Sequence, residues 1–157
     1  MSFDVRSFRQ ALGCFATGIV VVTAGRNGNW RGITVNSFSS LSLDPPLILW
    51  SIAKSSRRYL SFTNASEFTV SVLSVENRAS AEAIATAGEG ELTAVPLEDC
   101  DDCPPAVAGA IAVFECSRET LYDGGDHVIV VGRVKAFRQR PGAPLVFFRG
   151  KYGSVTE

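Results

Sequence analysis

Apolar and polar residues alternate in steps of three and four near the N-terminus of the chain. The apolar positions are Val5, Phe8, Leu12 and Phe15. This spacing predicts an amphipathic helix over residues 4–17, because one face of a helix repeats every three to four residues. Ser2 or Asp4 is suited to cap the start of this helix, and Gly18 follows its end.

Beyond residue 18 the pattern changes to short apolar runs separated by turn residues, which is typical of β-strands. We expect strands over residues 19–24, 30–35, 47–53, 67–74, 110–121, 127–138 and 144–149. Asn27-Gly28 predicts a tight hairpin between the first two strands, since it accepts positive φ angles. A second hairpin is expected at residues 122–126. Residues 67–74 alternate polar and apolar side chains, so we expect one wet face on that strand.

Two short helices are expected among the strands, over residues 55–64 and 76–87. Residues 88–105 carry acids, glycine and proline, and we expect them to form a mobile loop that lies over a site. Short strands at hairpin spacing favour a mainly β fold, a closed antiparallel barrel with peripheral helices. No repeat or linker divides the sequence, so we expect one domain over residues 1–157.

Composition narrows the class of protein. Hydrophobic residues make up 46% of the 157 residues and charged residues 20%, which is typical of a globular chain rather than a disordered one. The net charge is -1 and no basic block is present, so nucleic acid is not an expected partner. The sequence has no apolar run long enough to span a membrane and no signal peptide, and we therefore expect a cytoplasmic protein.

The four cysteines leave more than one interpretation open. Cys14 and Cys116 lie in apolar segments and are most simply buried small hydrophobes. Cys100 and Cys103 have the spacing of half a zinc site or of a redox motif, but Pro104 follows directly and no second pair exists. We favour an acidic loop at this point, with a labile surface thiol pair as the alternative, and we expect no metal site.

The most informative segment is Gly32–Leu47, which reads GITVNSFSSLSLDPPL. It places short hydroxyl and amide side chains between two expected strands: Thr34, Asn36, Ser37, Ser39, Ser40 and Ser42. Such residues bond readily to nearby backbone and break regular ladders, so they suit a loop that offers donors to a ligand. A Ser-rich surface loop is the alternative, although the segment also keeps large apolar residues that a solvated loop rarely has.

A second candidate is Ser51–Arg58, which reads SIAKSSRR, where an expected strand ends before an expected helix. Ser55 and Ser56 supply hydroxyl donors, and Lys54 or Arg57 supplies positive charge beside the free N–H groups of a helix start. These features predict a phosphate site. A basic helix cap on the surface is the alternative.

Two weaker candidates lie nearer the C-terminus. Asp126 precedes the only histidine, His127, at the start of an expected strand, and is suited to fix the tautomer of the ring. Tyr152 is able to stack on a ring, and Arg149 or Lys151 to pair with a phosphate. A structural histidine and a plain C-terminal strand with solvated charges are the alternatives.

These segments together resemble the short-chain flavin reductases, the reductase components of two-component flavin-dependent monooxygenases. FATGIVVVTA, GITVNSFSSLSLDPPLILWSI, EFTVSVLS, GDHVIVVGRV and PLVFFRGKY occur in the family's order and at about its spacings. The resemblance implies a split β-barrel of the FMN-binding type, antiparallel and Greek-key-like. It also implies a homodimer with both sites at the subunit interface. Residues 88–105 are the least typical part, and Val35 replaces a common alanine.

The resemblance also assigns a ligand to each candidate segment. Residues 32–37 are implied to meet the flavin ring, and residues 51–57 the FMN phosphate or the ribityl chain. His127, beside Asp126, is implied to contact NAD(P)H near the reactive face of the flavin and is the catalytic candidate. The residues concerned are Gly32, Thr34, Val35, Asn36, Ser37, Ser51, Lys54, Ser55, Ser56, Arg57, Asp126, His127, Arg149 and Tyr152.

The implied function is an NAD(P)H:flavin oxidoreductase. It transfers a hydride from reduced nicotinamide to FMN or FAD and supplies the reduced flavin to a partner monooxygenase. No GxGxxG fingerprint is present, so the nicotinamide cofactor would bind without a Rossmann domain. One alternative is a flavin-binding carrier or subunit that holds FMN tightly without turnover. Others are an enzyme that reduces a different acceptor through a tightly held flavin, and a redox-responsive protein that uses Cys100 and Cys103. The sequence does not distinguish FMN from FAD, or NADH from NADPH.

Overall fold

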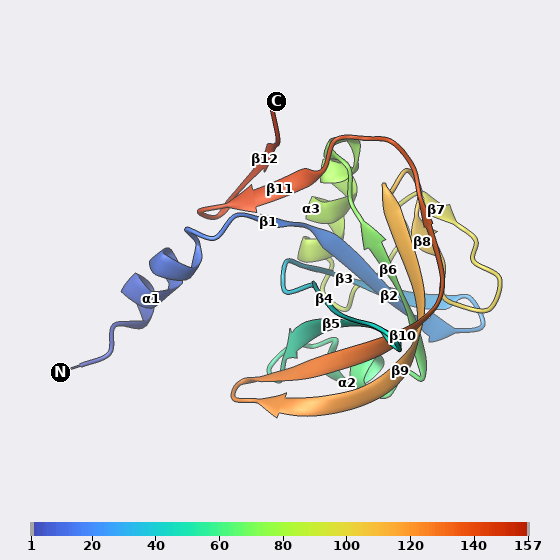
Figure 1. The fold of residues 1–157 in the computed structure, drawn as a ribbon, viewed down its shortest axis with the longest axis horizontal. Coiled ribbons are helices and arrows are strands. Elements are labelled where there is room, and N and C mark those ends of the chain that lie inside the picture. Colours follow the sequence, from blue (N-terminus) through green and yellow to red (C-terminus); the bar gives the residue numbers. More distant parts are fainter. Residues whose placement is uncertain (1, 157) are drawn as a thin grey trace.

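A seven-stranded antiparallel sheet forms the body of the computed structural model, which describes residues 2–156 (Figure 1). Its strand order is β3-β2-β6-β9-β10-β5-β4. The strands are β2 (Val20–Arg26), β3 (Asn29–Val35), β4 (Ser39–Leu43), β5 (Pro46–Ala53), β6 (Glu67–Val72), β9 (Ala112–Gly124) and β10 (His127–Gln139). The sheet curls around an apolar core in which Trp50 packs edge-on against Phe62 and Phe68, with ring centroids 5.5 and 6.0 Å away.

A smaller sheet and the helices complete the fold. The sheet has the order β1-β11-β12, formed by β1 (Thr17–Gly18), β11 (Leu145–Phe148) and β12 (Lys151–Ser154). The helices are α1 (Val5–Leu12), α2 (Tyr59–Thr63), the 3-10 turn η1 (Val75–Asn77) and α3 (Arg78–Thr86). A second apolar cluster, which includes Val21, Leu73 and Ile84, joins α3 to the strands.

The N-terminal helix is shorter than the sequence predicted. Its start is capped as expected, because the Asp4 carboxylate accepts a hydrogen bond of 3.0 Å from the Arg6 N–H. The helix stops at Leu12, before Gly13, and the chain enters β1 at Thr17 instead of continuing as helix. None of its residues is buried, and α1 stands away from the barrel (Figure 1).

Both predicted hairpins are present, with one difference. Asn27 and Gly28 have positive φ angles of 52° and 81°, as the tight turn between β2 and β3 requires. In the second hairpin β9 continues to Gly124, so that only Gly125-Asp126 connects it to β10. The turn is therefore shorter than expected, and it holds His127 at the first position of β10.

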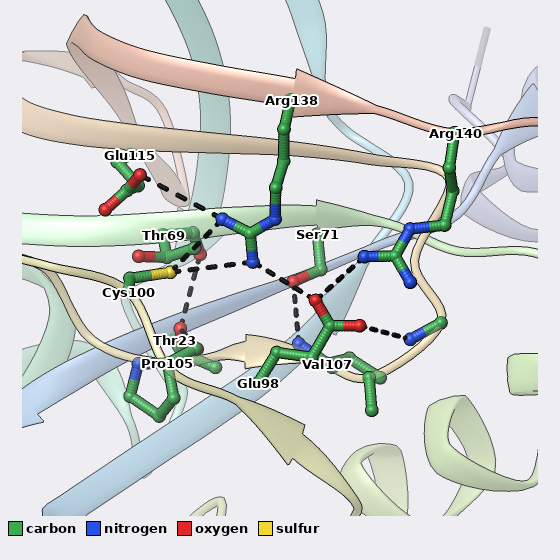
Figure 2. Close-up of polar contacts among 12 residues, drawn as sticks. Thr23, Thr69, Ser71, Glu98, Cys100, Pro105, Val107, Glu115, Arg138 and Arg140 are labelled. Carbon is green, nitrogen blue, oxygen red and sulfur yellow. Dashed lines mark hydrogen bonds and ion pairs between the residues drawn. The ribbon is translucent and has the colours of Figure 1, made fainter.

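Two expectations about polar segments are wrong. Ser39–Leu43 is not loop but the edge strand β4, which pairs with β5. β6 has no wet face, because Thr69 and Ser71 are fully buried together with their apolar neighbours. The Thr69 hydroxyl donates to the Pro104 carbonyl at 2.5 Å. The Ser71 hydroxyl accepts from the Val107 N–H at 3.0 Å (Figure 2). The polar side chains on that face of β6 are therefore hydrogen-bonded to the backbone of residues 104–107 instead of to water.

The expected mobile loop over residues 88–105 instead packs on the outside of the barrel. Leu92 and Val95 are buried there, and the short strands β7 (Leu97–Glu98) and β8 (Ala106–Val107) pair with each other. The Thr23 hydroxyl donates to the Pro105 carbonyl at 2.6 Å, which fastens the end of the segment to β2 (Figure 2). The segment is thus a fixed wall of the fold.

Candidate active site

Two of the residues predicted to contact the flavin ring, Gly32 and Thr34, form hydrogen bonds within the chain. The N–H of Gly32 donates to the Gly90 carbonyl at 2.8 Å, and the Gly32 carbonyl accepts from the Arg58 guanidinium. The Thr34 hydroxyl donates to the Ala81 carbonyl of α3 at 2.9 Å. The backbone of Gly32 and the side chain of Thr34 therefore position β3, and neither is a free donor within this chain.

Val35 and Ser37 shape the place where β3 leaves the sheet. The Val35 side chain is half-buried against the barrel core. Ser37 lies where the β4–β5 register, continued by two residues, pairs it with Ser51. Its hydroxyl accepts from the Ser51 N–H at 3.0 Å and donates to the Ser51 carbonyl at 3.1 Å. A side chain thus replaces the ladder hydrogen bonds at this point and holds β5 beside the end of β3.

A pocket of about 390 Å³ opens beside this contact, and Thr17, Asn36, Phe147 and Arg149 are among its lining residues. The Thr17 hydroxyl is buried and has no hydrogen-bond partner among residues 2–156. The Asn36 amide is exposed, and the Arg149 guanidinium lies 5.0 Å from the Phe148 ring. The pocket therefore offers hydroxyl, amide and guanidinium groups beside apolar surface, the donor set that the edge of a flavin ring needs.

Tyr152 lies apart from this pocket's polar groups. Its ring meets the Phe147 ring edge-on at 5.5 Å, and the Arg78 guanidinium lies 5.3 Å from its centroid. Burial raises the pKa of the Tyr152 phenol above its ordinary value. The side chain is therefore used to pack β12 against α3, and the predicted stacking role is not visible within one chain.

Four charged or titratable side chains meet where β5 ends and the β9–β10 hairpin turns. His127 pairs with Ala53 across the sheet, and its Nδ1 lies 2.7 Å from the Asp126 carboxylate. The Lys54 ammonium forms an ion pair with Asp123, and its backbone N–H donates to the Asp126 carbonyl at 2.9 Å. The hydrogen bond with His127 holds the pKa of Asp126 below its usual range. Asp123, which sequence analysis missed, fixes Lys54 toward the hairpin.

The serines that follow Lys54 do not lie at a helix N-terminus. α2 begins only at Tyr59 and has five residues, so the predicted contribution of helix N–H groups is wrong. Ser55 and Arg57 are exposed, whereas the Ser56 hydroxyl accepts from the Arg58 N–H at 3.1 Å. Arg57 forms no ion pair among the described residues. The exposed Ser55 hydroxyl and Arg57 guanidinium in this turn are therefore the groups available to a phosphate.

The predicted residues thus fall into two neighbouring groups joined by β5. One surrounds the β3–β4 connection and contains Asn36, Ser37 and Ser51. The other, at the end of β5, contains Lys54 and His127, with the Ser55–Arg57 turn. Figure 1 shows that the β3–β4 connection, the end of β5 and the tip of the β9–β10 hairpin lie on the same side of the barrel.

The cysteine pair is not at this site. Cys100 and Cys103 are both half-buried; the Cys100 sulfur lies 3.8 Å from an Arg138 nitrogen, and the Cys103 thiol donates to the Cys116 carbonyl at 3.9 Å. Within residues 2–156, no three His, Cys, Asp or Glu side chains are placed to hold a metal ion. None of the described helices has the length and apolar character needed to cross a membrane.

Comparison with known proteins places this geometry in a family. The model of the flavin reductase like domain matches residues 12–156. The chain belongs to the flavin reductase-like family. It is 45% identical over 148 residues to the FMN reductase (NADH) SmoA of Agrobacterium fabrum, which covers 94% of this chain and 84% of that protein. Other relatives are longer, and the chain spans about half of their length.

Two further members of the family are informative. The chain is 32% identical over 155 residues to the reductase subunit HsaB of a flavin-dependent monooxygenase from Rhodococcus jostii, covering 98% and 80% of the two chains. It matches the NADH:FAD oxidoreductase SgcE6 of Streptomyces globisporus, solved with NAD and FAD fragments, with a TM-score of 0.92. That match has 34% identity and covers 98% and 93% of the chains. These findings confirm the predicted family, the split β-barrel, the flavin reductase class, and flavin with a nicotinamide nucleotide as cofactors.

Proposed function

We propose that this flavin reductase-like protein transfers a hydride from NADH or NADPH to FMN or FAD and supplies the reduced flavin to a partner monooxygenase. The observation that carries the proposal is that the exposed Asn36 amide at the β3–β4 connection and the Asp126–His127 pair lie on the same side of the barrel, with β5 between them (Figure 1). Relatives named as an FMN reductase and as a monooxygenase reductase subunit support it. A cytoplasmic location and a single domain over residues 1–157 remain our proposals.

The residues of the pocket fit a flavin. The Thr17 hydroxyl and the Asn36 amide are suited to meet the polar edge of the ring, and the Ser55–Arg57 turn to hold the phosphate. A bound flavin supplies the acceptor of two electrons, which side chains of this type do not provide. The chain's part is to orient the ring and the nicotinamide, because proximity and alignment account for much of such a rate enhancement.

His127 is proposed to orient the nicotinamide. The Asp126 carboxylate lies beside Nδ1, which favours the tautomer with the proton on Nδ1 and leaves Nε2 as an acceptor. A carboxamide N–H of the nicotinamide is a donor of the matching kind. His127 is half-buried, at the margin of the barrel where a ligand is able to reach it. No proton transfer is assigned to it.

We also propose a homodimer with the sites at the subunit interface. Five large apolar side chains of the N-terminal segment are exposed: Phe3, Val5, Phe8, Leu12 and Phe15. A monomer would leave this apolar stripe in water at a cost of roughly 25 cal/mol per Å². Because the pocket with Asn36 and Arg149 is also lined by Leu12 and Phe15, a second copy covering the stripe would border the flavin site.

The proposal is tested by NADH and NADPH oxidation by the purified protein, with and without added FMN, FAD or riboflavin. We expect turnover that requires and saturates with added flavin, which would identify the flavin as a substrate and reveal the preferred nucleotide. Turnover by a flavin that stays bound would instead indicate a prosthetic group. Flavin binding without any turnover would overturn the proposal in favour of a carrier or subunit.

A further inference from the structure

The β9–β10 hairpin has an outer face that the proposed function uses only at His127. Side chains alternate between the two faces of a strand. Val128 and Val130 are buried in the apolar core, so His127 and Ile129, which alternate with them along β10, lie on the outside of the barrel. Both are half-buried, and the tip of the hairpin lies at the margin of the barrel (Figure 1).

The strand register places two residues of β9 on the same outer face. Tyr122 pairs with Ile129, and Gly124 pairs with His127. Directly paired residues of antiparallel strands project from one face, and diagonal neighbours lie about 7–8 Å apart. Tyr122 is the diagonal neighbour of His127, and 58% of its surface is exposed. An exposed aromatic ring therefore stands near the histidine on the face that a ligand is able to reach.

Gly124 leaves the backbone bare between these two side chains. A Cβ at this position would lie 3.4 Å from the His127 carbonyl oxygen and 3.6 Å from Cγ1 of Ile129, which are ordinary contact distances. The φ angle of Gly124 is not in the left-handed region. Neither space nor conformation therefore requires glycine here. A strand glycine of this kind marks a place where another group is able to approach the backbone closely.

The outer face continues to the residues proposed to meet the flavin. Ile129 pairs with Ser51 of β5 on its other side, and the Ser37 hydroxyl is hydrogen-bonded to the Ser51 backbone. Neighbouring strands lie about 4.8 Å apart, so the row from Ser51 through Ile129 to Tyr122 measures about 10 Å. Atoms that exchange a hydride must approach to about 3–3.5 Å. A nicotinamide beside the flavin would therefore lie over this face of the hairpin.

We propose that Tyr122 is a positioning residue for the nicotinamide ring of NAD(P)H, which lies against the Gly124 backbone between Tyr122 and His127. The inference rests on the proposed function and deepens it. The tyrosine ring supplies a flat apolar flank, and Ile129 supplies apolar surface beside it. The absence of a side chain at Gly124 lets the ring approach the strand. His127 then holds the carboxamide while Tyr122 limits how the ring is able to turn.

The test measures the Kd of NADH and of reduced nicotinamide mononucleotide, which lacks the adenosine half, from the fluorescence of the dihydronicotinamide. Gly124→Ala places a methyl group where the ring is proposed to lie, and we expect both Kd values to rise about tenfold. Tyr122→Ala should raise both about fivefold, because an aromatic contact is lost. Tyr122→Phe keeps the ring and should retain most of the affinity.

Phe137→Ala is the matched control. It removes an aromatic side chain that is 72% exposed near the other end of β10, and both Kd values should stay within about twofold of the wild type. Thermal unfolding and FMN titration of each variant complete the measurement. We expect Gly124→Ala to keep the wild-type Tm, since its Cβ fits the fold, and to bind FMN within about twofold of the wild type.

Several outcomes would overturn the inference. One is wild-type affinity for both nucleotides in Gly124→Ala or Tyr122→Ala, and another is a wild type that binds neither nucleotide. A loss for NADH without a loss for the mononucleotide would place the adenosine half at Gly124 instead. A lower Tm with an equal loss of FMN affinity would show a structural role only. Flavin-dependent NADH oxidation by the wild type in any of these cases would leave the proposed function standing, whereas its absence would reject that function and the inference together.

Discussion

At the scale of single residues, the orientation of His127 depends on its neighbour in the sequence. Asp126 is almost fully exposed, yet its carboxylate is directed at Nδ1 of the ring, 2.7 Å away. The sequence predicted this pair from adjacency alone. It did not predict that Asp123 engages Lys54 on the same hairpin, because that contact joins residues 69 positions apart.

Replacement of His127 by alanine should raise the NADH KM about fivefold, the loss expected for one hydrogen bond, while flavin affinity stays nearly constant. Asp126→Asn should give a smaller change in the same direction, because the amide orients the ring less firmly than the carboxylate. Steady-state kinetics and flavin titration make the measurement. Asp123→Asn is a matched control on the same hairpin, and an unchanged KM in His127→Ala would remove His127 from the site.

The cysteine side chains should react slowly in the folded protein. Burial raises the pKa of Cys100 and Cys103, and that of Cys116 to about 12, so little of the reactive thiolate is present at neutral pH. At pH about 7.5 we expect iodoacetamide to modify Cys100 and Cys103 at least about tenfold more slowly than free cysteine. Cys116 should react only after unfolding. Rapid labelling of the pair, followed by mass spectrometry, would revive the redox-responsive alternative.

At the scale of elements, a side chain links β5 to the end of β3. Ser37→Ala would leave the Ser51 N–H and carbonyl without their partner, at a cost of about 1–3 kcal/mol in the free energy of unfolding. Urea denaturation is the measurement. Ser39→Ala is the matched control, since the Ser39 hydroxyl is exposed and, within residues 2–156, bonds only to the adjacent Ser40 carbonyl. Equal stability of the two variants would contradict the linking role of Ser37.

The wall formed by residues 88–107 is fastened to β10 by Glu98. Its carboxylate accepts from the Gly109 N–H and from Arg140, both at 2.9 Å, and from Arg138 at 3.3 Å (Figure 2). The Gly109 N–H first, and the two arginines after it, hold the pKa of Glu98 below its usual range. Because the pKa is lower in the folded state, the stabilisation is complete above the unfolded-state pKa and disappears as pH falls through the folded one.

Glu98→Gln should therefore lower the free energy of unfolding by about 2 kcal/mol at pH about 7. The difference from the wild type should begin to shrink near a pH of about 4.3, where the carboxylate of the unfolded chain is protonated, and should disappear as the pH falls through the lower pKa of the folded state. Thermal unfolding of both proteins across this range tests the prediction. A difference independent of pH would mean that packing, rather than charge, accounts for the contribution of Glu98.

The sequence predicted helices and strands best where apolar residues are buried and polar residues are exposed. β2, β3, β5 and the Asn27-Gly28 hairpin follow directly from apolar runs and turn chemistry. β1, β4, β7 and β8 were missed as strands, because two residues or a run of serines carry no strand signal. β12 was foreseen only as the alternative to a binding role for its residues. The burial of Thr69 and Ser71 was missed for a different reason: their partners are carbonyls more than thirty residues away.

At the scale of the whole molecule, the exposed apolar stripe on α1 predicts self-association. Phe8→Glu with Leu12→Glu should convert a dimer into a monomer and weaken FMN binding, since the stripe borders the pocket with Asn36 and Arg149. Size-exclusion chromatography with light scattering and flavin titration make the measurement. Gln10→Glu adds a charge to the same helix and should leave the mass unchanged. A wild-type monomer that binds FMN fully would contradict the interface site.

The candidate site was predicted in its parts but not in its arrangement. Residue types and family motifs pointed to residues 32–37, 51–57 and 126–127. Only the three-dimensional structure shows that Gly32 and Thr34 are hydrogen-bonded to other parts of the fold, that Arg58 is buried against β3 and the end of α3, and that Lys54 is paired with Asp123. Such contacts depend on residues from α3 and the hairpin, which no local pattern specifies.

The central position of β6 in the sheet determines how its backbone amides exchange with solvent. This strand pairs with β2 on one edge and β9 on the other, and four of its six residues are buried. No local fluctuation exposes its amides without separating three strands and lifting the segment that holds Thr69 and Ser71. Hydrogen exchange at β6 therefore proceeds through global unfolding, and the slowest exchange rates of the chain report its total conformational stability.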